Sequence, residues 1–339
     1  MKSLPLINLQ YLIENHWYKK DNLILTIILY PLSLIFLFIS TIRRVLFKLN
    51  IFKSYKLPVP VVIIGNITVG GAGKTPLTLK IAKELSSQGY KVGIILRGYK
   101  SEIKTVTVVN KNHTASQVGD EAMIYVTNDQ LVAIGSNRYL AGIELLKHYP
   151  DIQIILSDDG LQHYRLKRDY EIAVIDSTRL LGNQHLLPMG PLREKKNRLK
   201  SVDAIIYNGD INYQLIKSSD KQLILSQQII LDKIINYHTN TTISIDTLNQ
   251  KPYIHAIAAI GNPQRFFDFI KANNINITST QALPDHYDFK DYMLPNQYSA
   301  ILVTEKDYVK LHSKDNGILY GKMVVILNLA ITRMLKTIR

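Results

Sequence analysis

Apolar residues in the middle of the chain fall in short continuous runs, each ending in Gly, Ser, Asn or Asp and separated by longer helix-like segments. Six such runs within residues 59–210 are VPVVIIGN, KVGIILRGY, LVAIGSNR, IQIILSDDG, YEIAVIDS and VDAIIYNGD. Because the apolar positions are continuous rather than alternating, the pattern predicts strands buried on both faces, in a mainly parallel sheet covered by helices. We therefore expect a doubly wound α/β fold with its functional groups at the carboxyl ends of the strands.

A second, smaller α/β unit is predicted in the C-terminal part of the chain. It begins with a strand and a helix over residues 253–274, and apolar runs recur at 300–311 and 322–330. The segment before it is polar and rich in β-forming residues, which favours a connecting ribbon. We expect an N-terminal membrane-associating segment at 1–57, a first α/β domain at 58–210, a connecting β-ribbon at 211–252 and a smaller C-terminal α/β domain at 253–339.

One segment is apolar without interruption. Twenty-one uncharged residues lie between Asp21 and Arg43, and as a helix they would extend roughly 32 Å, about the thickness of a bilayer's hydrocarbon core. A cleaved signal peptide is disfavoured, because the run is too long and no small-residue cleavage site follows it. A buried core helix is the second alternative, but few core helices are this long without a charge. We prefer a membrane helix, which either spans the bilayer or lies in its interface, because Thr26, Tyr30 and Ser33 form a weak polar stripe.

The charge of the chain favours anionic partners. The net charge is +14 and there is no cysteine, which excludes disulfides, thiolate metal sites and cysteine nucleophiles. A basic cluster at residues 43–56 directly follows the apolar run, so we expect it at the cytoplasmic side of a membrane, against anionic lipids. Nucleic acid is a disfavoured partner, because no aromatic residues interleave with the charges and no nucleic-acid-binding module is recognisable.

The stretch GNITVGGAGKTP at residues 65–76 has the pattern of a phosphate-binding loop, except that Thr68 replaces the opening glycine of G-x-x-x-x-G-K-[ST]. Thr68 fits if the backbone there needs no positive φ, and the glycines leave N–H groups free to turn toward phosphate oxygens. Lys74 would reach the β- and γ-phosphates of ATP, and the Thr75 hydroxyl would bind Mg²⁺. A ligand-free glycine-rich turn is disfavoured, because strand, loop and helix follow in the required order. The predicted nucleotide-binding residues are Thr68, Gly70, Gly71, Ala72, Gly73, Lys74 and Thr75.

Acidic residues at the ends of two predicted strands are candidates to anchor the magnesium shell. Asp158 and Asp159 end one strand and Asp176 ends another. The paired carboxylates form the denser constellation, so we prefer them to Asp176, although Asp-Gly is also common in turns. The predicted metal site therefore consists of Thr75, Asp158 and Asp159.

Two further elements have both a functional and a structural interpretation. Asp120, with Glu121 after it, follows a glycine at a helix start, where it either caps the helix or serves as the general base for an attacking hydroxyl. His286 lies in a loop of the second unit and can reach across a cleft to orient and tune a carboxylate. Arg193 opens a strongly basic window, which forms either a solvated face or a clamp for an anionic head group.

Eight elements, in order and spacing, resemble the tetraacyldisaccharide 4′-kinases, the lipid A kinases of Gram-negative bacteria. They are GNITVGGAGKTP, LRGY, VGDE, DDGLQH, LLPMGPLRE, AIGNPQRFF, PDHY and VTEKD. The resemblance implies a P-loop NTPase-type kinase that transfers the γ-phosphate of ATP, with Mg²⁺, to the 4′-hydroxyl of a tetraacylated glucosamine disaccharide 1-phosphate. It implies an enzyme anchored by its N-terminal helix at the cytoplasmic face of the inner membrane, and no protein partner.

The resemblance also implies roles for individual residues. Asp120 matches the catalytic base and His286 its partner, while Lys74 holds the nucleotide phosphates. Tyr287 stands where many family members have a second histidine, so only one histidine can serve here. The family also carries Thr or Ser at the position of Thr68. Residues expected to contact the substrate are Glu121, Arg138, His163 and Arg193.

A function from another class also fits part of the pattern. A membrane-tethered P-loop ATPase that acts as a switch or loads a partner would account for the phosphate loop and the apolar helix. It would not account for an acidic base together with a distant histidine. The TEKD segment at residues 304–307 belongs to the resemblance, but no role for it follows from the sequence.

Overall fold

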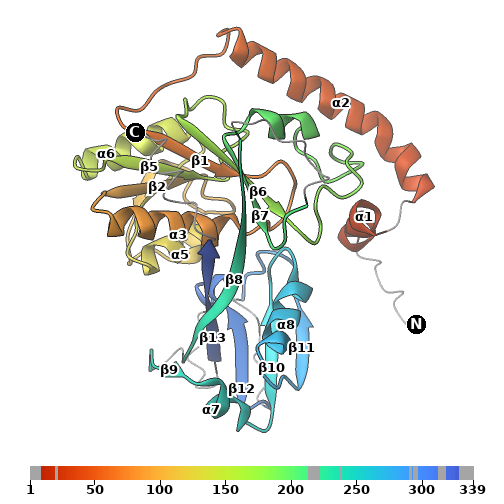
Figure 1. Ribbon diagram of the computed structural model, residues 1–339, viewed down its shortest axis with the longest axis vertical. Helices are drawn as coiled ribbons and strands as arrows, with labels where there is room; N and C mark the ends of the chain where they lie inside the picture. The colour runs from red at the N-terminus through yellow and green to blue at the C-terminus, as the bar shows by residue number, and fades with distance from the viewer. Residues whose placement is uncertain are drawn as a thin grey trace.

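The structure is a computed structural model that describes residues 9–19, 22–212, 222–236, 239–289, 292, 297–311 and 318–327. Its described strands join into one large sheet, with helices on both sides and one long helix lying apart from the rest (Figure 1).

The first half of the sheet contains the predicted buried strands. They lie in the order β7-β6-β1-β5-β2-β4, all parallel, and β3 (Thr107–Val109) pairs antiparallel at the edge. Every residue of β1, β2, β5, β6 and β7 is buried, as expected for strands covered on both faces. The bounds are β1 Val61–Gly65, β2 Val92–Leu96, β4 Leu131–Ile134, β5 Ile154–Asp158, β6 Tyr170–Asp176 and β7 Ala204–Asn208.

Helices cover both faces of this half, so the predicted doubly wound α/β fold is confirmed. Leu77 and Ile81 of α3 (Lys74–Ser87) and Tyr125 of α5 (Asp120–Thr127) belong to one buried apolar cluster. Leu145 of α6 (Arg138–His148) belongs to the cluster on the opposite face. The remaining short helices of this half are α4 (Ala115–Val118) and the 3₁₀ helix η1 (Lys196–Ser201). Each strand of the first half is thus fixed from both sides, which holds the loops at the strand ends in place.

The second half continues the same sheet in the order β11-β10-β12-β13. Its core includes Phe266 and Phe267 of α8, which pack with Ile254 and Leu302 of neighbouring strands. A predicted strand–helix unit is therefore present at this place. The bounds are α7 Ile245–Asn249, β10 Ile254–Ala258, α8 Pro263–Ala272, β11 Ser279–Ala282, β12 Ala300–Thr304 and α9 Glu305–Tyr308.

A long antiparallel ribbon joins the two halves. β8 (Leu223–Asn236) pairs with β7 at its start and with β13 (Ile318–Leu327) along most of its length, while β9 (Thr242–Ile243) pairs with its end. Figure 1 shows β8 and β13 running from the lower to the upper half of the molecule. The domain limits given above stay predictions.

The apolar N-terminal segment forms α2 (Leu23–Lys48), which follows α1 (Leu9–Tyr18) and lies outside the sheet (Figure 1). It is the one described helix that is long and apolar enough to cross a membrane. Ser33 is buried, and its Oγ donates a hydrogen bond to the carbonyl of Leu186 at 2.9 Å. The large apolar side chains of α2 that point away from the protein are exposed, for example Ile27 and Phe38 at 66% each.

Candidate active site

The loop between β1 and α3 has the backbone of a phosphate-binding loop. Gly70 and Gly73 adopt positive φ values of 106° and 86°, whereas Thr68 does not. A side chain at Gly73 would bring its Cβ within 2.2 Å of Asn208 Nδ2. The missing opening glycine therefore costs no backbone strain, because the positions that need glycine have it.

Two side chains hold the loop from neighbouring strands. Asn208 at the end of β7 donates from Nδ2 to the carbonyl of Ala72 at 3.0 Å, and Gln227 of β8 donates from Nε2 to the carbonyl of Gly73 at 3.3 Å. Arg265 of α8 donates from Nη2 to Asn208 Oδ1 at 2.8 Å, so the second half of the molecule also supports the loop. The sequence analysis missed these residues, although polar residues at the ends of buried strands are the signal that could have revealed them.

Asp158 and Thr75 form the part of the site that suits a magnesium ion. The Thr75 hydroxyl donates to Asp158 Oδ2 at 3.3 Å and the Tyr125 hydroxyl donates to the same oxygen at 2.7 Å. Asp158 Oδ1 is buried and has no hydrogen-bond partner among the described residues. Burial raises the pKa of Asp158 to about 6, against the effect of Lys74. A buried carboxylate oxygen without a partner, next to a threonine hydroxyl, fits a hard cation that prefers oxygen ligands.

Asp159 makes a different set of contacts, all with cations. Lys74 Nζ lies 3.5 Å from Asp159 Oδ1, and Arg193 Nη1 donates to both carboxylate oxygens at 3.0 Å. Burial would raise the pKa of Asp159, but Lys74 and Arg193 outweigh it and hold that pKa well below its usual range. The backbone of Asp159 has a φ of 48°, an uncommon value for a residue other than glycine. Asp159 is thus paired with the phosphate-loop lysine and with the predicted substrate arginine.

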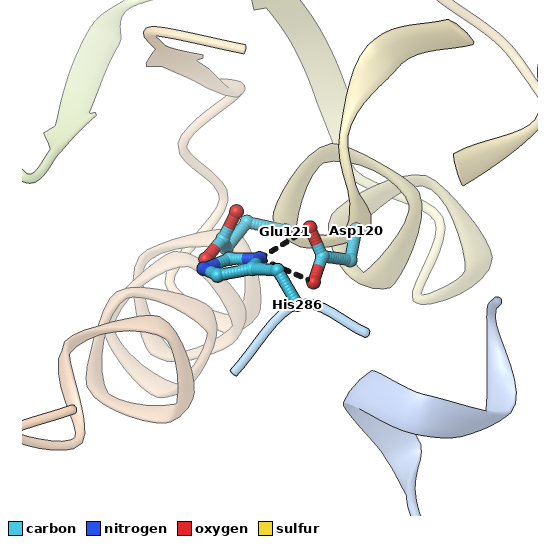
Figure 2. Close-up of side chains that lie close together, drawn as sticks. All are labelled: Asp120, Glu121 and His286. Carbon is cyan, nitrogen blue, oxygen red and sulfur yellow. Dashed lines mark hydrogen bonds and ion pairs between the residues drawn. The ribbon is translucent and has the colours of Figure 1, made fainter. Parts of the chain in front are cut away.

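Asp120 and His286 are in direct contact, although 166 residues separate them. Figure 2 shows the imidazole facing the carboxylate, with His286 Nδ1 3.1 and 2.8 Å from its two oxygens. The N-cap of α5 is Gly119, which makes no side-chain capping bond, so the interpretation of Asp120 as a helix cap is wrong. His286 has a φ of 60°, and its ring stands edge-on to Tyr99 with centroids 5.0 Å apart. An uncommon backbone conformation therefore accompanies the contact.

The Asp120 carboxylate is ionised because of its neighbours. Burial alone would raise its pKa, but the hydrogen bond with His286 and the charge of Lys306 lower it to about 2. Lys306 lies in the TEKD segment, for which the sequence analysis found no role. Its ammonium stands 3.8 Å from Asp120 and 3.3 Å from Glu121.

The predicted substrate residues differ in their surroundings. Glu121, Arg138 and Arg193 line the cleft that also contains the phosphate loop, whereas His163 does not line it. Arg138 donates from Nη2 to the carbonyls of Asp158 and Asp159 at 3.2 and 2.8 Å, and its Nε has no partner among the described residues. Burial, followed by Arg138 and other arginines, lowers the pKa of His163 to about 3, so this ring is neutral. Arg138 thus supports the end of β5, and a direct substrate contact by His163 stays a prediction.

A cleft of about 1740 Å³ connects these groups. The phosphate loop and Lys74 line one part of it and His286 another, and the apolar and basic face of α2 from Phe36 to Lys48 lines a third. A phosphate-binding loop, the histidine partner of Asp120 and an apolar helix thus face a common space.

A buried charge network lies beside this cleft. Arg198 is 4% exposed and contacts Glu171 at 2.5 Å and Glu194 at 3.8 Å. Glu194 also accepts a hydrogen bond from Gln162 at 2.9 Å and lies 3.9 Å from Arg44 at the end of α2. Arg44 is therefore connected to the interior of the protein as well as to solvent.

Comparisons with known proteins agree with this geometry. A model of the family described as tetraacyldisaccharide-1-P 4′-kinase matches residues 25–338. A tetraacyldisaccharide 4′-kinase of Chromobacterium violaceum is 40% identical over 300 residues, covering 88% of each chain. One of Pasteurella multocida is 41% identical over 298 residues, covering 87% of this chain and 88% of the relative. The crystal structure of LpxK from Aquifex aeolicus in complex with ATP superposes with a TM-score of 0.77 at 25% identity, over 91% of this chain and 98% of that one.

Proposed function

Because the chain belongs to the tetraacyldisaccharide-1-phosphate 4′-kinase family and is an ATP-dependent kinase of lipid A biosynthesis, we propose that Asp120 is the base that activates the acceptor hydroxyl. The observation that carries this proposal is the direct contact of Asp120 with His286, whose imidazole lines the same cleft as the phosphate loop. A kinase needs such an arrangement, because the acceptor hydroxyl must meet the γ-phosphate in line with the leaving group.

The groups of the cleft then have the following roles. Asp120 takes the proton of the 4′-hydroxyl while the oxygen of that hydroxyl bonds to the γ-phosphorus. The bond from the γ-phosphorus to the β–γ bridging oxygen breaks at the same time. His286 orients the carboxylate. Lys74 and the amides of the loop bind the nucleotide phosphates and stabilise charge on the transferring group. The acceptor is an acylated disaccharide phosphate.

Thr75 and Asp158 are the residues that would hold Mg²⁺, with Asp159 near them. When bound, the ion neutralises charge on the β- and γ-phosphates. The Asp158 oxygen without a partner supports this assignment, because a buried carboxylate oxygen needs a cation or a donor. Arg193 shares the carboxylate of Asp159 with Lys74, which supports its role near the transferred phosphate.

The direct test is phosphate transfer from γ-labelled ATP to extracted acyl disaccharide 1-phosphate. We expect label on the lipid, in an amount that depends on both lipid and Mg²⁺. A protein that releases label only as free phosphate, with or without lipid, would instead be the tethered ATPase that acts as a switch. The comparisons do not favour that alternative.

We also propose that α2 lies flat in the interface of the membrane. Ser33, near the middle of its apolar stretch, is bonded to Leu186, and near its end the Phe47 ring packs on Tyr164 with centroids 6.0 Å apart. A spanning helix would carry these parts of the enzyme into the hydrocarbon core, where their exposed backbone groups would lack partners. A flat helix instead exposes its apolar side chains to lipid and brings its basic end to anionic head groups.

The two orientations differ in which side of the membrane the ends of α2 reach. The chain has no cysteine, so Leu23→Cys and Leu49→Cys, at exposed positions at the two ends of the helix, each create a single thiol. In sealed inside-out vesicles we expect a membrane-impermeant maleimide to label both variants from the same, cytoplasmic face. Labelling of Leu23→Cys only after the vesicles are opened with detergent, while Leu49→Cys reacts at once, would mean that the helix spans.

A further inference from the structure

The ammonium of Lys306 lies at the centre of the candidate active site. Its Nζ is 3.8 Å from Asp120 Oδ2, 3.3 Å from Glu121 Oε1 and 3.4 Å from Asp285 Oδ1. It also lies 3.3 Å from His286 Nε2, the ring nitrogen that does not face Asp120. Lys306 is therefore the one charged group that touches both the base and its histidine partner in the described part of the chain.

Lys306 is held in this place by the residues around it in the sequence. Thr304 caps α9 by accepting a hydrogen bond from the Asp307 amide at 3.1 Å, and its hydroxyl donates to the Asp307 carboxylate at 2.7 Å. Asp307 is fully buried, accepts from the Ala259 amide at 3.0 Å and pairs with Lys310 at 2.8 Å. The short helix is thus tied to Ala259 directly after β10, and the carbonyl of Ala259 accepts a hydrogen bond from the His286 amide at 3.2 Å.

The contact between Lys306 and His286 favours one of the two positions of the histidine proton. A lysine ammonium has three hydrogens to donate and no acceptor, so His286 Nε2 can take part in a hydrogen bond with it only as the acceptor. The ring then carries its one proton on Nδ1, which faces the carboxylate of Asp120 at 2.8 Å. The opposite tautomer would bring two acceptors together at Asp120 and two donors together at Lys306.

We propose that Lys306 is a positioning residue of the phosphoryl transfer, which holds His286 donating from Nδ1 to Asp120 by donating a hydrogen bond to its Nε2. This inference rests on the proposed role of Asp120 as the base. The proton taken from the acceptor hydroxyl then stays on the Asp120 carboxylate during transfer, because Nε2 has no free lone pair to receive a second proton. The TEKD segment, which the sequence analysis left without a role, supplies this lysine.

The charges around the dyad are consistent with this role. Asp120 and Glu121 face Lys306 from α5, and Asp285 faces it from the His286 loop, where Asp285 Oδ1 also lies 3.7 Å from His286 Nε2. Lys310 is the second cation of the cluster, 4.0 Å from Asp120, and Tyr99 covers the ring of His286. Burial would lower the pKa of Lys306, but Glu121, Asp285 and Asp120 outweigh it and raise that pKa above its usual value. The lysine is therefore a charged donor throughout the neutral pH range.

The proton position can be measured directly in the whole protein. We expect ¹⁵N spectra of histidine-labelled enzyme in detergent, at neutral pH, to give His286 a protonated Nδ1 and an unprotonated Nε2. His286→Gln identifies the signals among the nine histidines. In Lys306→Met we expect both ring nitrogens to carry hydrogen. The carboxylates of Asp120, Glu121 and Asp285 then surround the ring, and the lysine ammonium that balances their charge is gone. Wild-type spectra with a protonated Nε2, or an unchanged pattern in Lys306→Met, would overturn the proposal.

Two further variants separate the contact with His286 from the loss of charge. Lys310→Met removes a cation near the same Asp120 oxygen without touching His286, so we expect the wild-type nitrogen pattern. Lys306→Arg retains a charged donor and should restore that pattern. A protonated Nε2 in Lys310→Met, at an unchanged melting temperature, would mean that charge alone controls the ring and that the Lys306 contact does not.

Kinetics give a second readout that a purely structural role would not change. Removing a cation beside the Asp120 carboxylate disfavours the ionised form of that carboxylate. In the pH profile of kcat for Lys306→Met, the acidic limb should therefore move to higher pH by roughly one unit. The dissociation constant of ATP should change little. A uniform loss of kcat at every pH, or a loss of ATP binding, would identify Lys306 as a structural residue or a phosphate ligand. Asp120→Asn tests the base itself, so an active Asp120→Asn enzyme would refute the proposed function rather than this inference.

Discussion

Replacing Asp120 by Asn is expected to lower kcat by about 10²- to 10⁴-fold, the usual contribution of a general base. The amide keeps the shape of the side chain and an oxygen that accepts the His286 proton, but it cannot take a proton from the acceptor hydroxyl. The phosphate loop does not touch Asp120, so the dissociation constant of ATP should stay within about twofold of the wild-type value. Steady-state transfer from γ-labelled ATP and equilibrium ATP binding measure the two quantities.

A matched control for this variant is Asp151→Asn, which alters an exposed carboxylate paired with Lys91 outside the cleft. Asp151→Asn should leave kcat and the dissociation constant of ATP unchanged. His286→Gln is expected to lower kcat less than Asp120→Asn, because it removes the partner and leaves the base. If Asp120→Asn lost ATP binding along with turnover, Asp120 would be a structural residue.

Replacing Arg198 by Met is expected to cause the largest loss of stability. The guanidinium is 4% exposed and contacts two carboxylates that are themselves buried, Glu171 and Glu194. Glu171 retains Arg168 at 2.8 Å, but the cation that remains to Glu194 is the more distant Arg44 at 3.9 Å. We therefore expect a cost at the lower end of the roughly 3–5 kcal/mol that breaking a buried ion pair causes. For a folding unit of this size the loss corresponds to a fall in melting temperature on the order of 10 °C. Thermal unfolding followed by circular dichroism measures it.

An exposed ion pair provides the comparison. Lys111 pairs with Asp129 at 2.6 Å, but both side chains are more than two-thirds exposed. Lys111→Met should therefore leave the melting temperature within about one degree of the wild-type value. Equal changes in melting temperature for Lys111→Met and Arg198→Met would show that burial does not determine how much these ion pairs stabilise the protein.

The parallel sheet and the phosphate loop could be predicted because each depends on a short stretch of sequence. A continuous apolar run indicates a strand buried on both faces, and β5 is such a strand in the structure. Gly70 and Gly73 of the phosphate loop stand where the backbone turns to positive φ, so the motif alone indicates the conformation. The residues indicated Asp120 and His286 as separate candidates, and only the family resemblance paired them, because nothing local in either segment indicates that the other is 2.8 Å away.

Other features depend on which strands become neighbours, and a single sequence does not contain that information. Asn208 and Gln227 support the phosphate loop only because β7 and β8 are paired next to each other. Lys306 reaches the dyad only because β12 pairs with β10, which sets α9 beside the His286 loop. The polar stripe on α2 was visible in the sequence, but the partner of Ser33 is a backbone carbonyl 153 residues away.

The ribbon of β8 and β13 has a consequence for how the second half of the molecule can move. Its backbone hydrogen bonds fix the register, from Asn236 opposite Leu319 to Gln227 opposite Leu327, with one irregularity after Lys322. Two paired strands twist and bend easily, but they cannot slide along each other without breaking the whole ladder. Any movement of the second half against the first would therefore bend or twist this ribbon and leave its register unchanged. Such a movement would keep the imidazole of His286 level with Asp120 along α5, so the alignment of the base with its partner depends on a structure far from both.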